Sequence, residues 1–210
     1  MIGSYKVTDA VTIQAGIADA TTPLNGFGPV PNQVQSSDKT IAASVAFTAP
    51  DSFGFAKGDT LSLGTLLNID GGGQDNFYAG LTVPTPMSAL KVGASFDLVS
   101  DNNQTTANRH NDSGFVLGAY SSFQATDKLS FNLRGEYFDL AGGTTTYAPY
   151  GATTNGKGEE VTATLQYNLW ANVISRAEFR WDHIDSGTAF SNTGGCADSF
   201  LLAANLIYTF

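Results

Sequence analysis

Residues 173–182, with the sequence VISRAEFRWD, decide the fold class. From Arg176 onwards, charged residues alternate strictly with apolar or aromatic ones. Successive side chains of a β-strand point to opposite faces of the sheet. The segment therefore predicts a strand with one charged face and one apolar face, and no 3.6-residue periodicity competes with that interpretation.

The same period of two recurs along most of the chain. Turn residues such as Gly, Pro, Asn and Asp separate the alternating segments, as is typical of β-proteins. Ten strands are predicted, at residues 10–18, 40–49, 60–69, 76–83, 90–98, 115–123, 129–137, 161–169, 173–182 and 199–210. The sequence thus predicts an all-β, antiparallel fold in a single domain over residues 1–210.

Composition excludes several classes of protein. Charged residues make up 14% of the 210 residues, well below the roughly 25% of an ordinary soluble domain. No stretch approaches the ~20 apolar residues of a transmembrane helix. The net charge of −9 argues against nucleic acid as a partner. One Cys and two His leave no disulfide framework and no zinc cluster, and no cofactor motif is present.

The connections between the predicted strands alternate in length. Short ones lie at residues 84–89, 126–128 and 168–172, whereas long polar ones lie at residues 20–39, 100–113, 142–159 and 186–198. Outer-membrane barrels have this asymmetry, with short periplasmic turns and long extracellular loops. The pattern favours an antiparallel transmembrane β-barrel over a soluble sandwich or a lipocalin-like barrel, in which the apolar face would point inward.

Aromatic residues near the strand ends support the membrane interpretation, because barrels carry aromatic girdles at both interfaces. The chain ends on Phe210 after an alternating strand, which resembles the signal that the bacterial barrel assembly machinery recognises. The residues assigned to the girdle and the C-terminal signal are Tyr167, Trp170, Trp181, Tyr208 and Phe210. Outer-membrane lipid is the expected surrounding of the barrel.

Four segments resemble the OmpL-like family of outer-membrane β-barrel porins. They are residues 5–17, residues 48–55 with the Phe53-Gly54-Phe55 turn, residues 176–183, and the closing residues 205–210. The resemblance implies a bacterial outer-membrane location and passive diffusion of small hydrophilic solutes or ions, without catalysis or a cofactor. It leaves assembly into a homo-oligomer open. Members are typically longer, and the chain matches their C-terminal half.

The start of the chain is expected to be the tail of a preceding strand. Residues 1–7 contain no basic and apolar regions of a signal peptide. Residues 4–13 parallel residues 122–131, where a full strand precedes the same Thr-Asp turn. Residues 1–7 are therefore predicted to be a strand stub, and the chain part of a larger barrel. The alternative is a ten-stranded barrel that closes alone.

Charged residues within the strands are the candidates for a pore lining. They are Lys91, Asp97, Arg134, Glu136, Arg176, Glu178, Arg180 and Asp182, four basic and four acidic. Such a ladder of charges can orient polar solutes in a channel. The alternative is that the charges pair across strands and fill a narrow interior. The second function considered is accordingly a closed, non-conducting barrel with a structural or loop-mediated binding role.

No catalytic or metal site is predicted. Asp182 and His183 are adjacent in a strand, so their side chains point to opposite faces and cannot act as a pair. His110 is interpreted as a solvated loop residue, and Cys196 as a lone thiol whose pairing is open. The many loop aspartates are interpreted as solvating charges.

Overall fold

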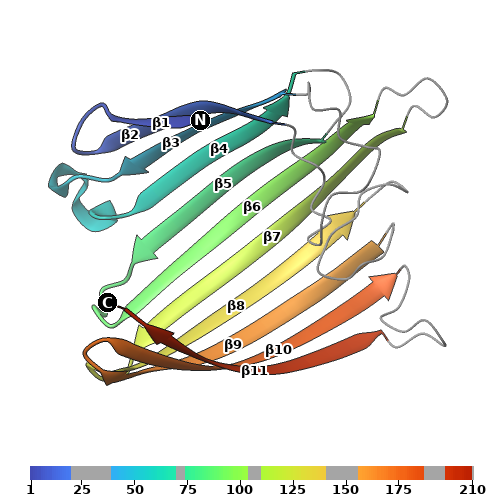
Figure 1. Cartoon of the computed structure of the whole chain (residues 1–210). Helices are drawn as coiled ribbons and strands as arrows, with labels where there is room; N and C mark the ends of the chain where they lie inside the picture. The colour runs from blue at the N-terminus through green and yellow to red at the C-terminus, as the bar shows by residue number, and fades with distance from the viewer. Residues whose placement is uncertain (20–38, 70–73, 104–109, 141–155, 187–196, 210) are drawn as a thin grey trace.

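Within the residues that the computed structural model describes, eleven strands form one antiparallel sheet, each paired with its neighbours in chain order (Figure 1). The structure describes residues 1–19, 39–69, 74–103, 110–140, 156–186 and 197–209. The strands are β1 (Ile2–Lys6), β2 (Val11–Asp19), β3 (Lys39–Thr48), β4 (Thr60–Asn68), β5 (Gln74–Pro84), β6 (Leu90–Asn103), β7 (His110–Gln124), β8 (Leu129–Leu140), β9 (Gly156–Trp170), β10 (Val173–Ser186) and β11 (Asp198–Tyr208). The predicted all-β fold is confirmed.

One end of the sheet carries the short connections. Two of them repeat one design, in which the Thr8 Oγ1 accepts the Val11 N–H at 3.0 Å and the Thr126 Oγ1 accepts the Leu129 N–H at 3.0 Å. The connection after β3 holds a 3₁₀ helix, η1 (Asp51–Ala56), and Gly54 and Gly58 there have φ values of 62° and 82°. Glycine suits these positions because it has no Cβ to clash at positive φ. No helix among the described residues has the length and apolarity needed to cross a membrane.

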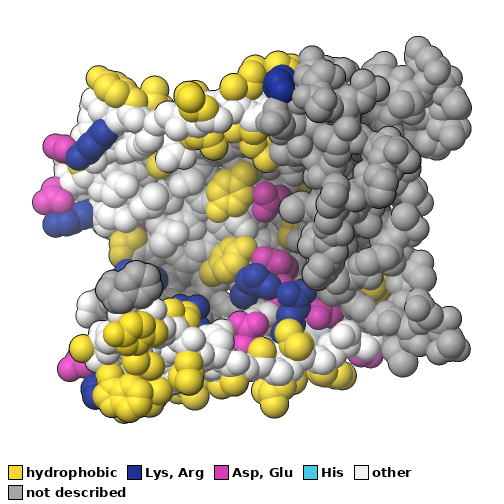
Figure 2. All heavy atoms as spheres, in the orientation of Figure 1, with side chains coloured by type: hydrophobic (Ala, Val, Ile, Leu, Met, Phe, Trp, Pro, Cys, Tyr) yellow, Lys and Arg dark blue, Asp and Glu magenta, His cyan; other side chains and the backbone are white. Residues whose placement is uncertain are grey.

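The strand register assigns every second residue to one face of the whole sheet. Arg134 on β8, for example, lies between Tyr120 on β7 and Thr162 on β9, and all three line one hollow. Figure 2 looks into this hollow, where acidic and basic side chains gather. We call this concave side the inner face and the opposite side the outer face.

The outer face is apolar and largely uncovered. Leu133 is 52% exposed and Leu202 is 81% exposed, and Phe131, Leu165 and Phe179 are exposed beside them. Among the described residues, the buried apolar cluster consists only of Val116 and Phe138, with Ile184 packed against it. A soluble β-domain would bury its apolar face. The sheet has the opposite arrangement, which is that of a membrane barrel.

The described part of the chain contains one strand more than the ten that the alternation predicts. Residues 2–6 pair with β2, from Ile2 opposite Gly16 to Lys6 opposite Thr12. The segment lies within residues 1–7, which were predicted to be a strand stub, and it was not counted among the ten strands because five residues are too few to establish a period of two. Among the described strands, β1 and β11 form the two edges of the sheet. They run in the same direction, because an antiparallel sheet reverses direction at each of its steps.

Two predicted loops are partly strand. β6 and β7 remain paired from Ser100 opposite Ser113 to Asn103 opposite His110, within the loop predicted at residues 100–113. β9 begins at Gly156, inside the loop predicted at residues 142–159. The sequence pattern did not predict these extensions, because their polar side chains do not alternate with apolar ones. A hairpin in water keeps its backbone hydrogen bonds without needing an apolar face.

Candidate functional site: the inner face of the sheet

All eight predicted pore-lining residues lie on the inner face. Lys91 and Asp97 come from β6, Arg134 and Glu136 from β8, and the other four, Arg176, Glu178, Arg180 and Asp182, from β10. The register connects them through neighbouring strands, as in the pairs of Lys91 with Ser122 and of Glu178 with Thr164. The structure therefore brings together residues that are far apart in the sequence.

Arg134 is the centre of the largest polar network on this face. Its Nη2 lies 2.5 Å from the Glu160 Oε2, and its Nε donates to the Glu160 Oε1 at 3.3 Å. The same Nε is 3.7 Å from the Glu136 Oε1. Glu160 is 3% exposed and also accepts a hydrogen bond from the Thr162 hydroxyl. The buried carboxylate is thus compensated by a charged and a neutral donor, as burial requires.

Tyr120 continues this network across two more strands. Its hydroxyl donates to the Glu136 Oε1 at 3.1 Å and lies 2.9 Å from the Ser95 Oγ. The Tyr120 side chain lies over Gly118, because a Cβ added to Gly118 would fall 2.5 Å from the Tyr120 Oη. A larger residue at position 118 would therefore displace the Tyr120 side chain from the inner face of the sheet.

A second set of contacts holds the charges of β10. The Arg180 Nη2 lies 2.8 Å from the Asp182 Oδ1, and Asp182 is 5% exposed. The Arg176 Nε donates to the Gln166 Oε1 at 2.8 Å. Glu178 accepts from the Thr164 hydroxyl at 3.1 Å. Most of the charged side chains are therefore held on the inner face by ion pairs or hydrogen bonds to neighbouring side chains.

Glu160 and Tyr120 belong to the polar network around Arg134 but were not among the predicted pore-lining residues. Glu160 stands directly before the predicted strand at residues 161–169, and its position two residues before Thr162 was a signal that it shares the polar face. Tyr120 stands between the apolar residues of β7, and the same parity would have placed it inside. The ion pair of Glu160 with Arg134 could not be predicted, because pairing between strands depends on register.

The inner faces of β2–β5 contain no charged side chain among the described residues. They carry mostly small or neutral polar groups, such as Ser44 and Gln14, whose side chains are 3.3 Å apart. Tyr78 on β5 lies over Gly80 in the way that Tyr120 lies over Gly118. Two exposed ion pairs, Lys6–Asp9 and Lys57–Asp51, lie at the turns of this region, and Asp75 lies near the other end of the strands, where its Oδ1 accepts the Asn68 N–H at 2.8 Å.

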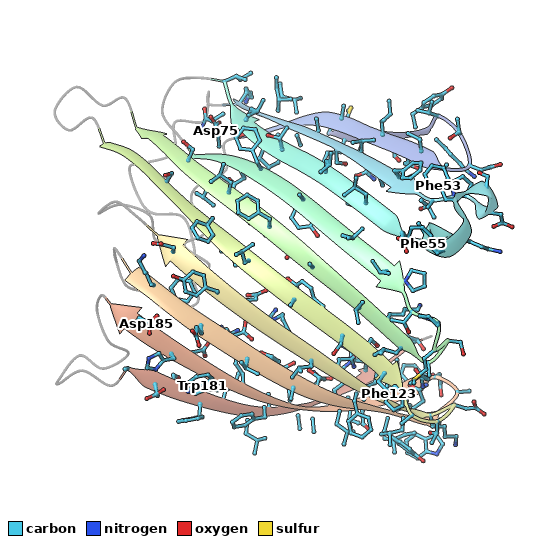
Figure 3. All side chains as sticks on the ribbon, turned by 180° about the vertical axis from the view of Figure 1, so that it is seen from behind. Phe53, Phe55, Asp75, Phe123, Trp181 and Asp185 are labelled. Carbon is cyan, nitrogen blue, oxygen red and sulfur yellow. The ribbon has the colours of Figure 1, made fainter. Side chains whose placement is uncertain are left out.

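The predicted girdle residues lie at both ends of the sheet. Tyr167, Trp170 and Tyr208 lie near the short turns, where Val173 pairs with both Trp170 and Tyr208. Trp181 lies near the other end and donates to the Asp198 Oδ1 at 2.9 Å. Figure 3 shows Trp181 and Phe123 at opposite ends of the sheet. Phe210 lies outside the described residues.

His183 lies on the outer face, opposite in parity to Asp182. Its Nδ1 is 2.9 Å from the Asp198 Oδ1, and its Nε2 is 3.4 Å from the Asp185 Oδ1. The described part of the chain contains no group of three or more His, Cys, Asp or Glu residues placed to hold a metal ion. Cys196 and the side chain of His110 lie outside the described residues.

Comparisons with known proteins agree with this geometry. No curated protein matches the chain in sequence. The structure is similar to that of the NanC porin, with a TM-score of 0.55, 11% identity, and coverage of 100% of this chain and 98% of that one. It is also similar to a porin structure refined at 1.8 Å resolution, with a TM-score of 0.56, 13% identity, and coverage of 99% of this chain and 60% of that one.

At these identities the two solved structures support the porin barrel fold alone. The family comparison goes further, because the profile of one family matches residues 1–210, the whole chain. That family is described as "Putative beta-barrel porin-2, OmpL-like", and it implies an outer-membrane location. The resemblance seen in the sequence segments is thereby confirmed, and the chain belongs to the beta-barrel porin-2, OmpL-like family.

Proposed function

We propose that this protein forms an outer-membrane channel for passive diffusion of small hydrophilic solutes or ions. One observation carries the proposal: the polar face of the sheet is concave and the apolar face is convex. Lipid solvates an apolar exterior, and a polar interior of sufficient width holds water. Diffusion through such an interior requires no turnover and no cofactor.

The composition of the inner face supports a weakly selective channel. Its described charges on β6–β10 are four basic and five acidic, the eight predicted residues together with Glu160. Most of them contact one another or neutral polar groups of the wall. A solute therefore meets a nearly neutral surface with many hydroxyl and amide groups. We expect small sugars and salts to pass with little preference for charge.

Single-channel recording tests the proposal directly. The chain is refolded in detergent, its β-structure is verified by circular dichroism, and it is then inserted into a planar bilayer with a KCl gradient. We expect stable open steps and a reversal potential near zero, because the wall is nearly neutral. A folded, inserted protein that gives no steps would contradict channel function.

The second candidate is a closed, non-conducting barrel, and one observation favours it. Val116, Phe138 and Ile184 form an apolar cluster on the inner face, where a water-filled channel has no need of one. If this cluster blocks the interior, the silent protein gains conductance on Phe138→Ala. If the interior is open without help, Phe138→Ala changes the step size of an already conducting protein. The two results separate the candidates.

A further inference from the structure

Two opposite charges stand in one row of the inner face. Lys91 on β6 pairs with Ser122, Ser122 with Asn132, and Asn132 with Thr164 in the register of successive strands. Thr164 in turn pairs with Glu178 on β10. The row therefore reads, around the wall, ammonium, hydroxyl, amide, hydroxyl and carboxylate. All five side chains line the same hollow of about 500 Å³.

The two ends of the row, like Asp97 and Arg176, take part in none of the ion pairs described on the inner face. Within the described residues, Lys91 has no carboxylate within 4 Å, and Glu178 has no cation within that distance. Glu178 accepts one hydrogen bond, from Thr164. Arg134 and Arg180, in the next row, are already paired with Glu160 and Asp182. Arg176 shares β10 with Glu178, but its Nε is directed to Gln166.

We propose that this row is a subsite for short zwitterionic peptides in extended conformation. The peptide carboxylate lies at Lys91, the amino terminus lies at Glu178, and Asn132 and the hydroxyls bind the peptide groups between them. This inference rests on the proposed channel function, since the solute reaches the row through the interior of the barrel. It adds the class of solute that the channel prefers.

The dimensions of the row match this class of ligand. Four strand spacings of about 4.8 Å separate β6 from β10, or roughly 19 Å along the curved wall. The Lys91 and Glu178 side chains shorten the gap, and a fully extended tetrapeptide spans about 14 Å. A single amino acid is too short to reach both ends. A neutral sugar reaches the hydroxyls but uses neither charge.

Binding of tetra-alanine to the folded protein in detergent tests the subsite, with isothermal titration calorimetry as the measurement. The control ligand is N-acetyl-tetra-alanine amide, which has the same backbone without terminal charges. We expect tetra-alanine to bind about fivefold tighter than the control ligand, as two weakly screened ion pairs allow. The preference should fall in 1 M salt, because screening shortens the reach of the charges.

Variants of the two ends make the test specific. Lys91→Gln and Glu178→Gln should each remove most of the preference for tetra-alanine, whereas the double variant K91E/E178K should retain it with the peptide reversed. Lys57→Gln is the matched control, because Lys57 pairs with Asp51 on the exposed η1 turn. If the single variants keep the preference, or if the swapped variant loses it while still folded, the subsite is wrong.

The experiment also separates the subsite from the channel. Conductance in KCl is measured on the same preparations. A protein that conducts KCl but binds both peptides equally overturns the subsite and leaves the channel. A protein that binds tetra-alanine through Lys91 and Glu178 but conducts nothing overturns the channel and leaves the binding row.

Discussion

The inner faces of β2–β5 and of β6–β10 differ, although the outer faces of the two halves are alike. The inner face of β2–β5, which we call the uncharged half, has no charge among its described residues. That of β6–β10, the charged half, has four basic and five acidic side chains. The outer faces of both are apolar, with Leu63 44% exposed and Leu133 52% exposed.

This difference shows which constraint acts on each face. Every strand in contact with lipid needs apolar side chains on its outer face, so the outer faces of the two halves have the same polarity. The inner face is free to concentrate charge on one side. There each buried carboxylate needs its own donors, as Glu160 has Arg134 and Thr162. The uncharged half needs none, because removing a hydroxyl or amide group from water costs less than removing a charge.

The largest expected effect tests the similarity of the outer faces. Leu63→Arg on β4 and Leu133→Arg on β8 should each destabilise the folded barrel by about 2–4 kcal/mol, because both place a charge in lipid near the middle of a strand. The measurement is reversible unfolding by guanidinium in lipid vesicles. Ser62→Arg and Asn132→Arg, one residue earlier on the inner face, are the controls and should cost far less. Equal costs on both faces would contradict the assignment of the faces.

The next effect distinguishes the inner faces. Glu160→Ala should destabilise the protein by about 2–3 kcal/mol, because it leaves the Arg134 guanidinium without its main partner. The value lies below that of a fully buried pair because the Arg134 side chain is 37% exposed. Ser44→Ala in the uncharged half should cost less than about 1 kcal/mol.

A double-mutant cycle checks that the cost of Glu160→Ala belongs to the ion pair. The double variant E160A/R134M should cost less than the sum of the costs of Glu160→Ala and Arg134→Met. Additive costs would mean that Glu160 acts through packing alone, and the charged half would then not depend on its ion pairs.

A smaller effect concerns the tyrosines that lie on the wall. Gly118→Ala should lower the stability by about 1 kcal/mol, because the new methyl group displaces Tyr120 from Ser95 and Glu136. It should also reduce the single-channel current, since the ring moves into the interior. Gly64→Ala in the uncharged half is the matched control, because its new Cβ would have no neighbour nearer than 3.7 Å. A current unchanged by Gly118→Ala would show that Tyr120 does not border the open path.

The smallest effect is the pH dependence of a turn beside the uncharged half. The Lys6 Nζ lies 2.7 Å from the Asp9 Oδ1. This hydrogen bond and the charge of Lys6 hold the pKa of the Asp9 carboxyl below its usual value of 3.8. A carboxyl whose pKa is lower in the folded state stabilises the protein above its unfolded pKa, and the contribution is lost as the pH falls through the folded pKa.

The test is an NMR titration of Asp9 in micelles below pH 4. Lys6→Gln should return the pKa of Asp9 to its ordinary value without a measurable change in unfolding at pH 7, because exposed ion pairs contribute little. If Lys6→Gln leaves the pKa of Asp9 unchanged, the Lys6–Asp9 ion pair does not lower that pKa.

The alternation of residues in the sequence predicted most of the strands and the face to which each charged residue belongs. It worked best where lipid imposes the pattern, as in β10, from Arg176 to Asp182. It failed where the pattern is absent. β1 is too short to show a period, and only the likeness of residues 4–13 to residues 122–131 indicated a strand stub there. The polar ends of β6 and β7 hold their hairpin through backbone hydrogen bonds that any side chain permits.

The partners of each inner side chain were not predictable in the same way. From the sequence, Arg134 could have paired with Asp97, Glu136 or Glu178, but the register sets it opposite Thr162, and its guanidinium contacts the diagonal neighbour Glu160. Likewise, nothing in the sequence shows that Tyr120 lies over Gly118. Such contacts depend on turn lengths and on the shift between neighbouring strands.

The sequence by itself therefore determined the β-fold and the two faces of the sheet, because successive side chains of a strand alternate and lipid accepts only one kind. The tertiary structure decided which inner charges are paired and which face the hollow. Lys91 and Glu178 share one row because four successive hairpin registers add up around the curved wall, and a sum of registers is a property of the assembled sheet rather than of any one strand.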